Sequence, residues 1–362
     1  MKFAIEVKPF KNESFISWFT RTAFLNGSDP KSFALSIWMK DSIFYLDLDR
    51  FISKQDISRI CKCTSLSYAI IRKLTLELQI NEVNTSISNN SYKKWYFLHP
   101  LAQKGKIRTN GIHFCSECLK LNTPYINKYW RLSWFIFCPI HKIRLLLSCP
   151  KCNQVFSPEK QDYLNPFIYL CSNCKYDLRT IKLESIDKDF LTFQNKLTNA
   201  FSNKRSIISF NLLKTKSKKD LFLTLNILLS FIYKILRQPL RFKTIIKAFG
   251  INSSHKFTIV NNGTFSRLNS QDRYELLQIV WKLLNCKTEH FIFILINNGV
   301  TQNILSQTYK TLSTTILYIN RHLSNKKLIR KVSRQKKDIK PKEIPEIEKL
   351  FRDIKPYLLN IE

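Results

Sequence analysis

Apolar side chains recur at helical spacing in two segments close to the N-terminus. The first segment ends at the stop signal Asn26-Gly27, and Asn12 is a candidate N-cap for it. The second segment begins at Asp29-Pro30. The residues expected on the packed faces are Phe15, Trp18, Phe19, Thr22 and Ala23 in the first, and Phe33, Ala34, Ile37 and Trp38 in the second. The pattern predicts two amphipathic helices that pack into one core.

Residues 55–76 show a shorter version of the same pattern and predict a helix-turn-helix unit. Ser67 is a candidate N-cap for its second helix, and residues 80–95 are polar enough for a linker. The two helices are expected to pack through Ile57, Ile60, Ile70, Ile71 and Leu74. Arg72 and Lys73 would then face outward, either toward a phosphate backbone or as part of a protein-docking surface.

Residues 185–362 are expected to be nearly all helical. Helical periodicity covers residues 219–236, 242–249, 271–284, 290–297 and 312–323, and Thr301 is a candidate cap between the last two. The succession of helices and glycine turns fits a second helix-turn-helix-like unit, with Lys310 and Arg321 as candidate nucleic-acid contacts, or an ordinary helical bundle. The longest apolar run, Leu221–Leu236, is too short and too polar to span a membrane.

Seven cysteines and one histidine form four pairs, each with two residues between its members. The pairs are Cys115/Cys118, Cys138/His141, Cys149/Cys152 and Cys171/Cys174. A C-x-x-C turn directs two thiolates at one ion, so these eight side chains predict two tetrahedral zinc sites, one Cys₃His and one Cys₄. Either the first pair joins the second and the third joins the fourth, or the pairing is cross-braced. Closed sites with four protein ligands are structural rather than catalytic.

The start of the chain, Met1–Glu6, lacks the apolar segment of a secretory signal, so we expect a cytoplasmic protein with reduced thiols rather than disulfides. The chain has 59 Lys and Arg against 26 Asp and Glu, a formal net charge of +33. This excess indicates a polyanionic partner, most simply nucleic acid. With six glycines, the chain has no phosphate-binding G-x-x-x-x-G-K or G-x-G-x-x-G loop, and it also lacks G-x-S-x-G and H-E-x-x-H.

The segment from Asn325 to Lys342 carries nine Lys and Arg with one Asp, which favours phosphate contact without sequence readout. The candidate contacts are Lys326, Lys327, Arg330, Lys331, Arg334, Lys336 and Lys337. From the residues, we expect a mostly α-helical fold with small zinc-ribbon β elements. The expected parts are an N-terminal helical domain (residues 1–110), a double zinc ribbon (111–180), a C-terminal helical domain (181–325) and a basic tail (326–362).

The opening motif of the chain resembles that of the TniQ/TnsD family of transposon target-selection proteins. The motif consists of Pro9, Glu13-Ser14, Ser17-Trp18, Arg21, Ala23 and Asn26-Gly27. Further similar features follow in order: Asp47-Leu48-Asp49, a helix-turn-helix ending in Leu74-Thr75-Leu76, and Tyr129–Trp134 ahead of the Cys138-Pro139 and Cys149-Pro150 pairs. The resemblance covers about residues 1–180. Thr64-Ser65 replaces the glycine usual at the turn of that unit.

The resemblance implies a non-enzymatic adaptor of a bacterial DNA transposon that marks a target and recruits the AAA+ ATPase TnsC. Family members either read an attachment site directly or ride, as a dimer, on an RNA-guided Cascade complex. In such a protein, Trp18 and Arg21 are candidate docking residues. Two other classes remain open: a zinc-ribbon transcription regulator, and a Mg²⁺-dependent nuclease using the acidic pair Asp47 and Asp49.

Overall fold

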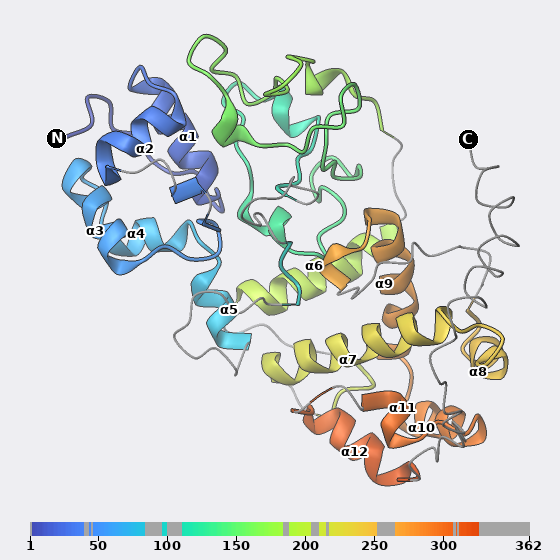
Figure 1. Ribbon diagram of the computed structural model, residues 1–362. Helices are drawn as coiled ribbons and strands as arrows, with labels where there is room; N and C mark the ends of the chain where they lie inside the picture. The colour runs from blue at the N-terminus through green and yellow to red at the C-terminus, as the bar shows by residue number, and fades with distance from the viewer. Residues whose placement is uncertain are drawn as a thin grey trace, which may run out of the picture. The chain divides into compact units, whose positions relative to one another are not determined.

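In the computed structural model, the described residues are 2–39, 43–44, 46–83, 96–99, 111–183, 188–203, 210–214, 217–251, 265–306, 309 and 311–325. The described residues all belong to one unit, Met1–Asn325, and the chain continues with a second unit, Lys326–Glu362. Lys310 and the whole second unit, with all seven candidate contacts of the basic tail, lie outside the described residues. Figure 1 shows the described part as helical at both ends, with an irregular segment between residues 111 and 183.

The two N-terminal helices are α1 (Phe15–Leu25) and α2 (Pro30–Trp38). The predicted N-cap of α1 was wrong, because Ser14 rather than Asn12 accepts the hydrogen bond from the Ser17 N–H. Asn12 instead takes a left-handed backbone conformation, with φ of 59°. Asp29 caps α2 and Pro30 occupies its first turn, as predicted. The aromatic faces of the two helices meet in the core, where the rings of Phe19 and Trp38 lie 5.2 Å apart.

The helix-turn-helix unit comprises α3 (Lys54–Cys63) and α4 (Tyr68–Lys73), followed by α5 (Glu77–Val83). Ser67 caps α4, as predicted, by accepting a hydrogen bond from the Ile70 N–H. The predicted packing residues are buried except Ile70, which is 40% exposed. The prediction that Ile70 packs between the helices was wrong, because α4 buries only a narrow face centred on Ile71.

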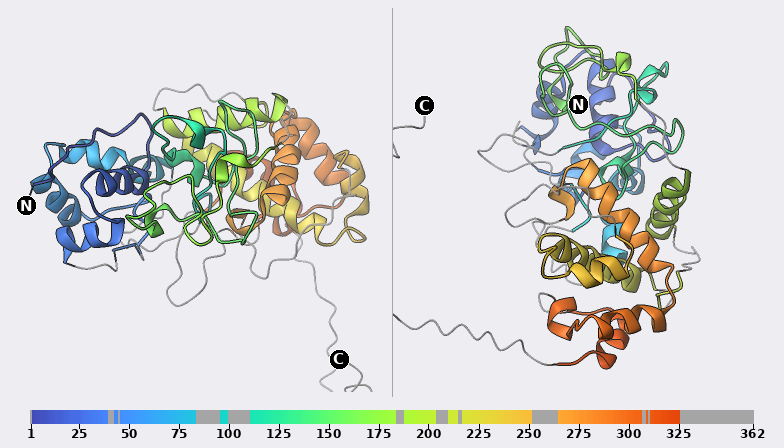
Figure 2. Two further views of the ribbon diagram at one scale, coloured as in Figure 1. Left: turned by 90° about the horizontal axis from the view of Figure 1, so that it is seen from above. Right: turned by 90° about the vertical axis from the view of Figure 1, so that its right-hand side faces the viewer.

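The middle segment, 111–183, is held by isolated β-bridges and 3-10 turns, and within the described residues these bridges are the form that the expected β elements take. The turns are η2 (Cys118–Lys120), η3 (Lys128–Arg131), η4 (Pro158–Lys160) and η5 (Leu178–Thr180). η4 packs against α1 and α2, and η2 packs against η5. Figure 2 shows how little regular structure the segment contains. The order of this segment therefore depends on side-chain contacts. The eight metal-ligand candidates all lie in this segment.

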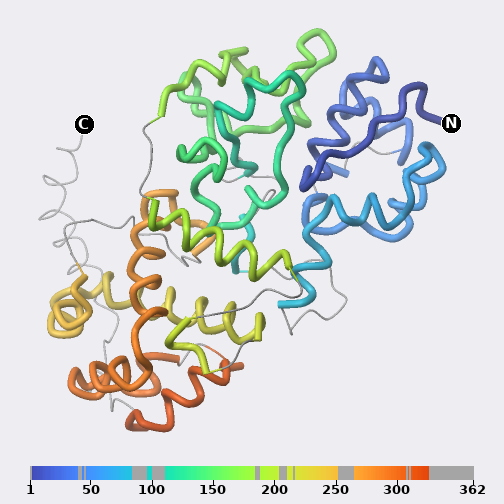
Figure 3. Tube along the Cα trace, turned by 180° about the vertical axis from the view of Figure 1, so that it is seen from behind, coloured from blue at the N-terminus to red at the C-terminus, as the bar shows by residue number. Residues whose placement is uncertain are grey.

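The C-terminal helices pack around one central helix, α7. The helices are α6 (Lys188–Ser202), α7 (Lys218–Leu236), α8 (Lys243–Ala248), α9 (Ser270–Leu284), α10 (Thr288–Asn297), α11 (Gln302–Ser306) and α12 (Thr314–His322). α7 contacts α5, α9, α11 and α12, and the opposite views of Figures 1 and 3 both show α5 beside the start of α7. The mostly helical fold class is confirmed. None of the described helices is both long and apolar enough to cross a membrane.

Candidate metal centres

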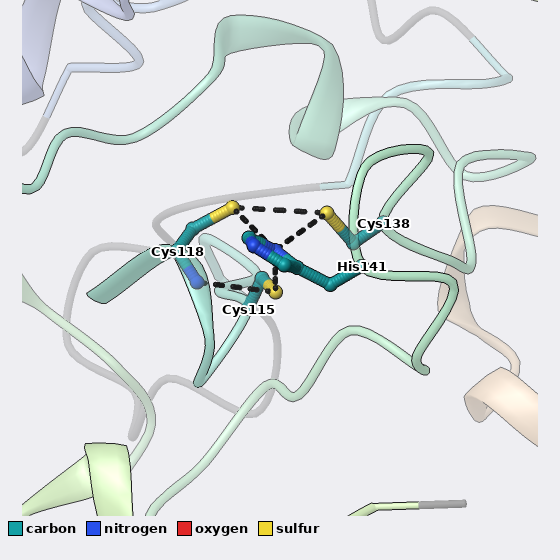
Figure 4. Close-up of side chains that lie close together, drawn as sticks. All are labelled: Cys115, Cys118, Cys138 and His141. Carbon is teal, nitrogen blue, oxygen red and sulfur yellow. Dashed lines mark hydrogen bonds between the residues drawn. The ribbon is translucent and has the colours of Figure 1, made fainter. Parts of the chain in front are cut away.

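Cys115, Cys118, Cys138 and His141 converge on one point, which we call centre one (Figure 4). The Cys118 Sγ lies 3.7 Å from the Cys138 Sγ and 3.3 Å from the His141 Nδ1. The same Nδ1 lies 3.5 Å from the Cys115 Sγ and 3.6 Å from the Cys138 Sγ. All three thiols are buried in the hydrophobic core, and His141 is half-buried.

Cys149, Cys152, Cys171 and Cys174 form centre two. The Sγ atoms of Cys149 and Cys174 are 3.7 Å apart, and those of Cys152 and Cys171 are 3.6 Å apart. Cys152 and Cys174 are half-buried, so centre two is nearer to solvent than centre one. The grouping is sequential: the first pair joins the second, and the third joins the fourth.

Both centres fit a tetrahedral zinc ion. A Zn–S bond of about 2.3 Å places two sulfurs at the corners of a tetrahedron about 3.8 Å apart, and a sulfur and a nitrogen about 3.6 Å apart. The contacts quoted above match these edges, and in each centre all four donor atoms lie within 4.8 Å of one another. Soft thiolates with imidazole favour zinc over magnesium or calcium. Four protein donors complete the coordination, so each centre suits a structural role.

Three of the four ligand pairs use one and the same turn. In each, the first cysteine donates its N–H to the carbonyl of the residue five positions later. The carbonyl of the same cysteine accepts a hydrogen bond from the N–H of the residue four positions later. The bonds are Cys138 N to Ile143 O and Lys142 N to Cys138 O, Cys149 N to Gln154 O and Asn153 N to Cys149 O, and Cys171 N to Tyr176 O and Lys175 N to Cys171 O, at 2.8–3.0 Å. A β-bridge closes each turn, at Phe137–Arg144, Ser148–Val155 and Leu170–Asp177.

The residue after the second ligand has a left-handed backbone in each of these turns. Lys142, Asn153 and Lys175 have φ of 56°, 57° and 56°. A lysine at such a position costs about 1–2 kcal/mol relative to a residue without a Cβ, whereas Asn is better tolerated. The closing hydrogen bonds therefore hold two lysines in a conformation that lysine ordinarily avoids.

The remaining pair, Cys115/Cys118, is built differently. It runs directly into the 3-10 turn η2, and the Leu119 N–H donates to the Cys115 carbonyl at 3.2 Å. Phe114 pairs with Leu146 through two backbone hydrogen bonds of 2.8 and 2.9 Å. This pairing brings the first ligand pair next to the chain that leaves the second.

Gln194 of α6 fixes the segment that leads into Cys138. Its Oε1 accepts hydrogen bonds from the N–H groups of Ile136 and Phe137, at 2.8 and 3.0 Å, and its Nε2 donates to the Phe137 carbonyl at 2.8 Å. The side chain is fully buried. The ring of Phe137 also packs edge-on against Phe190 of α6 and Tyr274 of α9. Centre one is thereby attached directly to the C-terminal helices.

Arg131, just upstream of Cys138, is fully buried between two carboxylates. Its Nη1 and Nη2 each donate to Asp47 at 2.8 Å, and Nη1 lies 3.6 Å from Asp49. Asp49 also accepts a hydrogen bond from the Ile16 N–H. Burial raises the pKa of Asp49 to about 6, against the opposing charge of Arg131. The acidic pair therefore binds an arginine and ties α1 to the middle segment, rather than offering open ligands for Mg²⁺.

A second buried arginine, Arg273 of α9, joins His99 and His113. It donates to the His99 Nε2 at 2.7 Å, to the His113 Nε2 at 3.2 Å and to the Ser133 carbonyl at 2.7 Å. Because a guanidinium can only donate, His99 is the Nδ1–H tautomer and donates to the Ser266 carbonyl at 3.0 Å. Burial, with Arg273 next, lowers the pKa of His99 well below its ordinary value. His113, close in sequence to Cys115, thus serves this cluster and not centre one.

Centre two has polar contacts of a more exposed kind. Arg179 forms a bidentate pair with Asp177 and lies 3.7 Å above the ring of Tyr169, and Lys175 pairs with Asp162 at 2.6 Å. Both side chains of the Arg179–Asp177 pair keep about a third of their surface in solvent. These contacts around centre two are partly exposed to solvent, unlike the buried contacts of Arg131 and Arg273.

The two candidate docking residues are not free surface groups. Trp18 is buried and donates its indole N–H to the Val7 carbonyl at 2.8 Å. Arg21 donates to both carboxylate oxygens of Glu13, at 3.0 and 2.8 Å, and lies over the ring of Phe10. Trp18 lies on the packed face of α1, as its helical spacing predicted. Its burial therefore corrects the expectation that Trp18 is a docking residue.

The described nucleic-acid candidates differ in availability. Arg72 is bound by Glu77 through two hydrogen bonds of 3.0 and 2.9 Å, which opposes a contact with phosphate. Lys73 is exposed at the end of α4, and Arg321 is exposed in the last turn of α12. Lys128 was missed by the sequence analysis. Its buried ammonium donates to the carbonyls of Lys73 and Thr75, at 2.6 and 3.2 Å, and so fixes the end of α4.

Residues 4–145 match the family model described as TniQ. The matched segment contains α1 to α5 and all four residues of centre one, and it ends before Cys149 of centre two. No curated protein matches the chain. The resemblance noted in the sequence is thus confirmed, over a shorter segment than the expected 1–180.

Proposed function

We propose that this protein is the target-selection subunit of a DNA transposon, because residues 4–145 match the TniQ family model. In this role it marks the insertion site, either on DNA directly or on an RNA-guided Cascade complex, and recruits an AAA+ ATPase of the TnsC type. The match to the TniQ model is the observation that carries the proposal. The excess of 59 Lys and Arg over 26 Asp and Glu supports a polyanionic partner.

The protein acts, in this proposal, as a non-catalytic adaptor. Support comes from Asp47 and Asp49, whose carboxylates are engaged by Arg131 and by backbone, and from both candidate metal centres, whose four protein donors suit structural zinc. Two zinc ions per chain would hold the middle segment, which has few regular elements of its own. The cell's cytoplasm, with its reduced thiols, would keep the eight ligands available.

The α3–α4 unit is proposed to dock protein rather than to read bases. Arg72 is held by Glu77, and Ile70 is 40% exposed on the surface of α4. Contact with nucleic acid is assigned instead to exposed Arg321 and to the basic segment 326–342. Such contacts neutralise phosphates and carry no sequence information by themselves.

The test is selection of bound fragments from sheared genomic DNA by the purified zinc-loaded protein, at about 150 mM salt, where long-range attraction is screened. Enrichment of one discrete sequence supports direct site reading, and uniform, salt-labile binding supports an adaptor guided by a partner. A parallel arm measures association with the TnsC-type ATPase. Enrichment of promoters, without any association with the ATPase, would overturn the proposal in favour of a transcription regulator.

A further inference from the structure

A cavity of about 500 Å³ lies among the C-terminal helices, outside the segment that matches the TniQ model. It is lined by residues of α7, α9 and α11, by the 3-10 turn η6 (Phe265–Arg267) and by Tyr309. Much of the wall is apolar, with Leu229, Phe265, Leu268, Leu276 and Leu305 among its residues. A cavity of this size accommodates a small ligand or the side chains of a short peptide.

Among the described residues, two cations and no carboxylate line the cavity. Lys234 donates from its Nζ to the Ile304 carbonyl at 3.3 Å, and Arg237 is exposed at the end of α7. Burial, and then the charge of Arg241, lowers the pKa of Lys234. Positive charge is therefore crowded at this end of α7, and an anion placed between the cations would relieve it.

Tyr309 does not supply that negative charge. Its hydroxyl contacts the Ser230 hydroxyl and donates to the Asn226 carbonyl at 3.1 Å. Burial raises the pKa of Tyr309 to about 12, so the phenol stays neutral near pH 7. The cavity thus combines a cationic edge with neutral hydroxyls and an apolar wall.

Three of the four aromatic rings that the described residues contribute to the wall are poorly placed to stack on a nucleobase. Phe231, Phe265 and Tyr233 are only 1%, 8% and 9% exposed, so none of these three offers an open ring face. Base recognition without pairing depends largely on such faces. The aliphatic side chains suit an apolar amino-acid side chain better, and the cations suit a neighbouring Asp or Glu.

We propose that this cavity binds a short acidic peptide of a partner protein. One apolar side chain of the peptide enters the cavity, and an adjacent carboxylate pairs with Lys234 and Arg237. The proposal goes beyond target selection, because it assigns a second docking site to helices that the TniQ match does not reach.

The test uses fluorescence anisotropy with the full-length, zinc-loaded protein at about 150 mM salt, which screens exposed charges. The probe is a labelled peptide library with fixed Asp and Glu flanks around two central positions that sample Leu, Ile, Val, Met, Phe, Tyr and Trp. One control library keeps the acidic flanks and has Ser at the centre. A second keeps the apolar centre and has Lys flanks. A labelled oligothymidine is the nucleic-acid arm.

Arg237→Glu reverses a charge at the cavity, and Asn303→Trp fills the cavity from its half-buried edge. Lys188→Glu is the matched control, because it makes the same charge change at the exposed start of α6. We expect the acidic apolar library to bind, Arg237→Glu and Asn303→Trp each to weaken it about tenfold or more, and Lys188→Glu to leave it unchanged. The Ser-centred and Lys-flanked libraries should bind at least about tenfold more weakly.

Several results would overturn the proposal. These are absence of binding up to roughly 1 mM peptide, equal binding of the Ser-centred library, and equal losses in Lys188→Glu and Arg237→Glu. Oligothymidine binding that both cavity variants abolish, with the peptide signal unaffected, would assign the cavity to nucleic acid. Circular dichroism melting of each variant separates loss of binding from loss of fold.

Discussion

Centre one and centre two share a turn, a spacing and a fit to zinc, yet their surroundings differ. Centre one has three buried thiols and lies within the TniQ match, where Gln194, Arg131 and Arg273 connect its neighbourhood to three other parts of the chain. Centre two lies beyond the match, with two buried and two half-buried ligands and with partly exposed ion pairs around it. The same turn therefore occurs in one centre whose neighbours are joined by buried polar side chains and in another whose polar contacts are partly exposed.

The largest expected difference comes from removing one ligand at each centre. Cys138→Ser should abolish cooperative unfolding, because zinc binding is worth on the order of 10 kcal/mol in zinc-finger peptides and a typical domain has only about 5–15 kcal/mol of stability. Cys171→Ser should lose one zinc ion and keep most of the helical signal. Metal analysis and circular dichroism check both, with the non-ligand Cys286→Ser as control. Equal damage from the two variants would remove the distinction between the centres.

Two bidentate arginine–aspartate pairs give the next comparison. Arg131→Met leaves Asp47 and the buried Asp49 without their cation, so we expect a loss of about 3–5 kcal/mol in the free energy of unfolding. Arg179→Met removes the solvent-exposed pair with Asp177 near centre two and should change stability little. Urea unfolding of the two variants measures the difference, and a larger loss for Arg179→Met would contradict it.

Gln194→Leu is expected to cost about 1–3 kcal/mol, because it leaves the N–H groups of Ile136 and Phe137 buried without their acceptor. The matched change near centre two is Gln161→Leu, which removes the donor to the Leu170 carbonyl. That change should cost less. Hydrogen exchange at Ile136 and Phe137 should rise in the first variant alone, and unchanged protection there would exclude the anchoring role.

Acid should destabilise the protein partly through His99, which faces Arg273, His113 and Arg131. The pKa of folded His99 lies well below the value of about 6.5 expected for the unfolded chain, so the unfolded state binds more protons and stability falls as the pH drops below about 6.5. Protonation of the zinc ligands adds a loss that is common to all variants. His99→Gln should reduce the slope by up to about 1.4 kcal/mol per pH unit between roughly pH 6.5 and 5. An unchanged slope would mean that His99 does not titrate on unfolding.

The smallest effect concerns the left-handed residues of the repeated turn. Lys142→Gly and Lys175→Gly should each stabilise by about 0.5–1 kcal/mol, since relief of strain is partly offset by the entropy of glycine in the unfolded chain. Asn153→Gly should be nearly neutral, because Asn tolerates this conformation. Thermal melting of the three variants checks the order. A loss of stability in either lysine variant would mean that its side chain contributes more than its backbone strain costs.

Both ligand sets were predictable from sequence, because each pair is a local motif and only the joining of pairs was left open. Caps such as Ser67 and Asp29 were predictable for the same reason, although Ser14 displaced Asn12 as the cap of α1. The contacts that distinguish the two centres were not predictable. Arg273 and His99 lie 174 residues apart in the sequence, and no pattern in either segment predicts their contact. Long-range pairing of buried polar groups depends on how the helices pack, which periodicity does not determine.

The most direct test of the account is stepwise chelation of the full-length protein, with released zinc and far-ultraviolet circular dichroism followed together. The account predicts two zinc ions per chain, released in two phases. The first, from the more exposed centre two, leaves the helical signal nearly intact, and the second, from the more buried centre one, removes it. Release of fewer than two ions, or loss of helix with the first ion, would contradict the account.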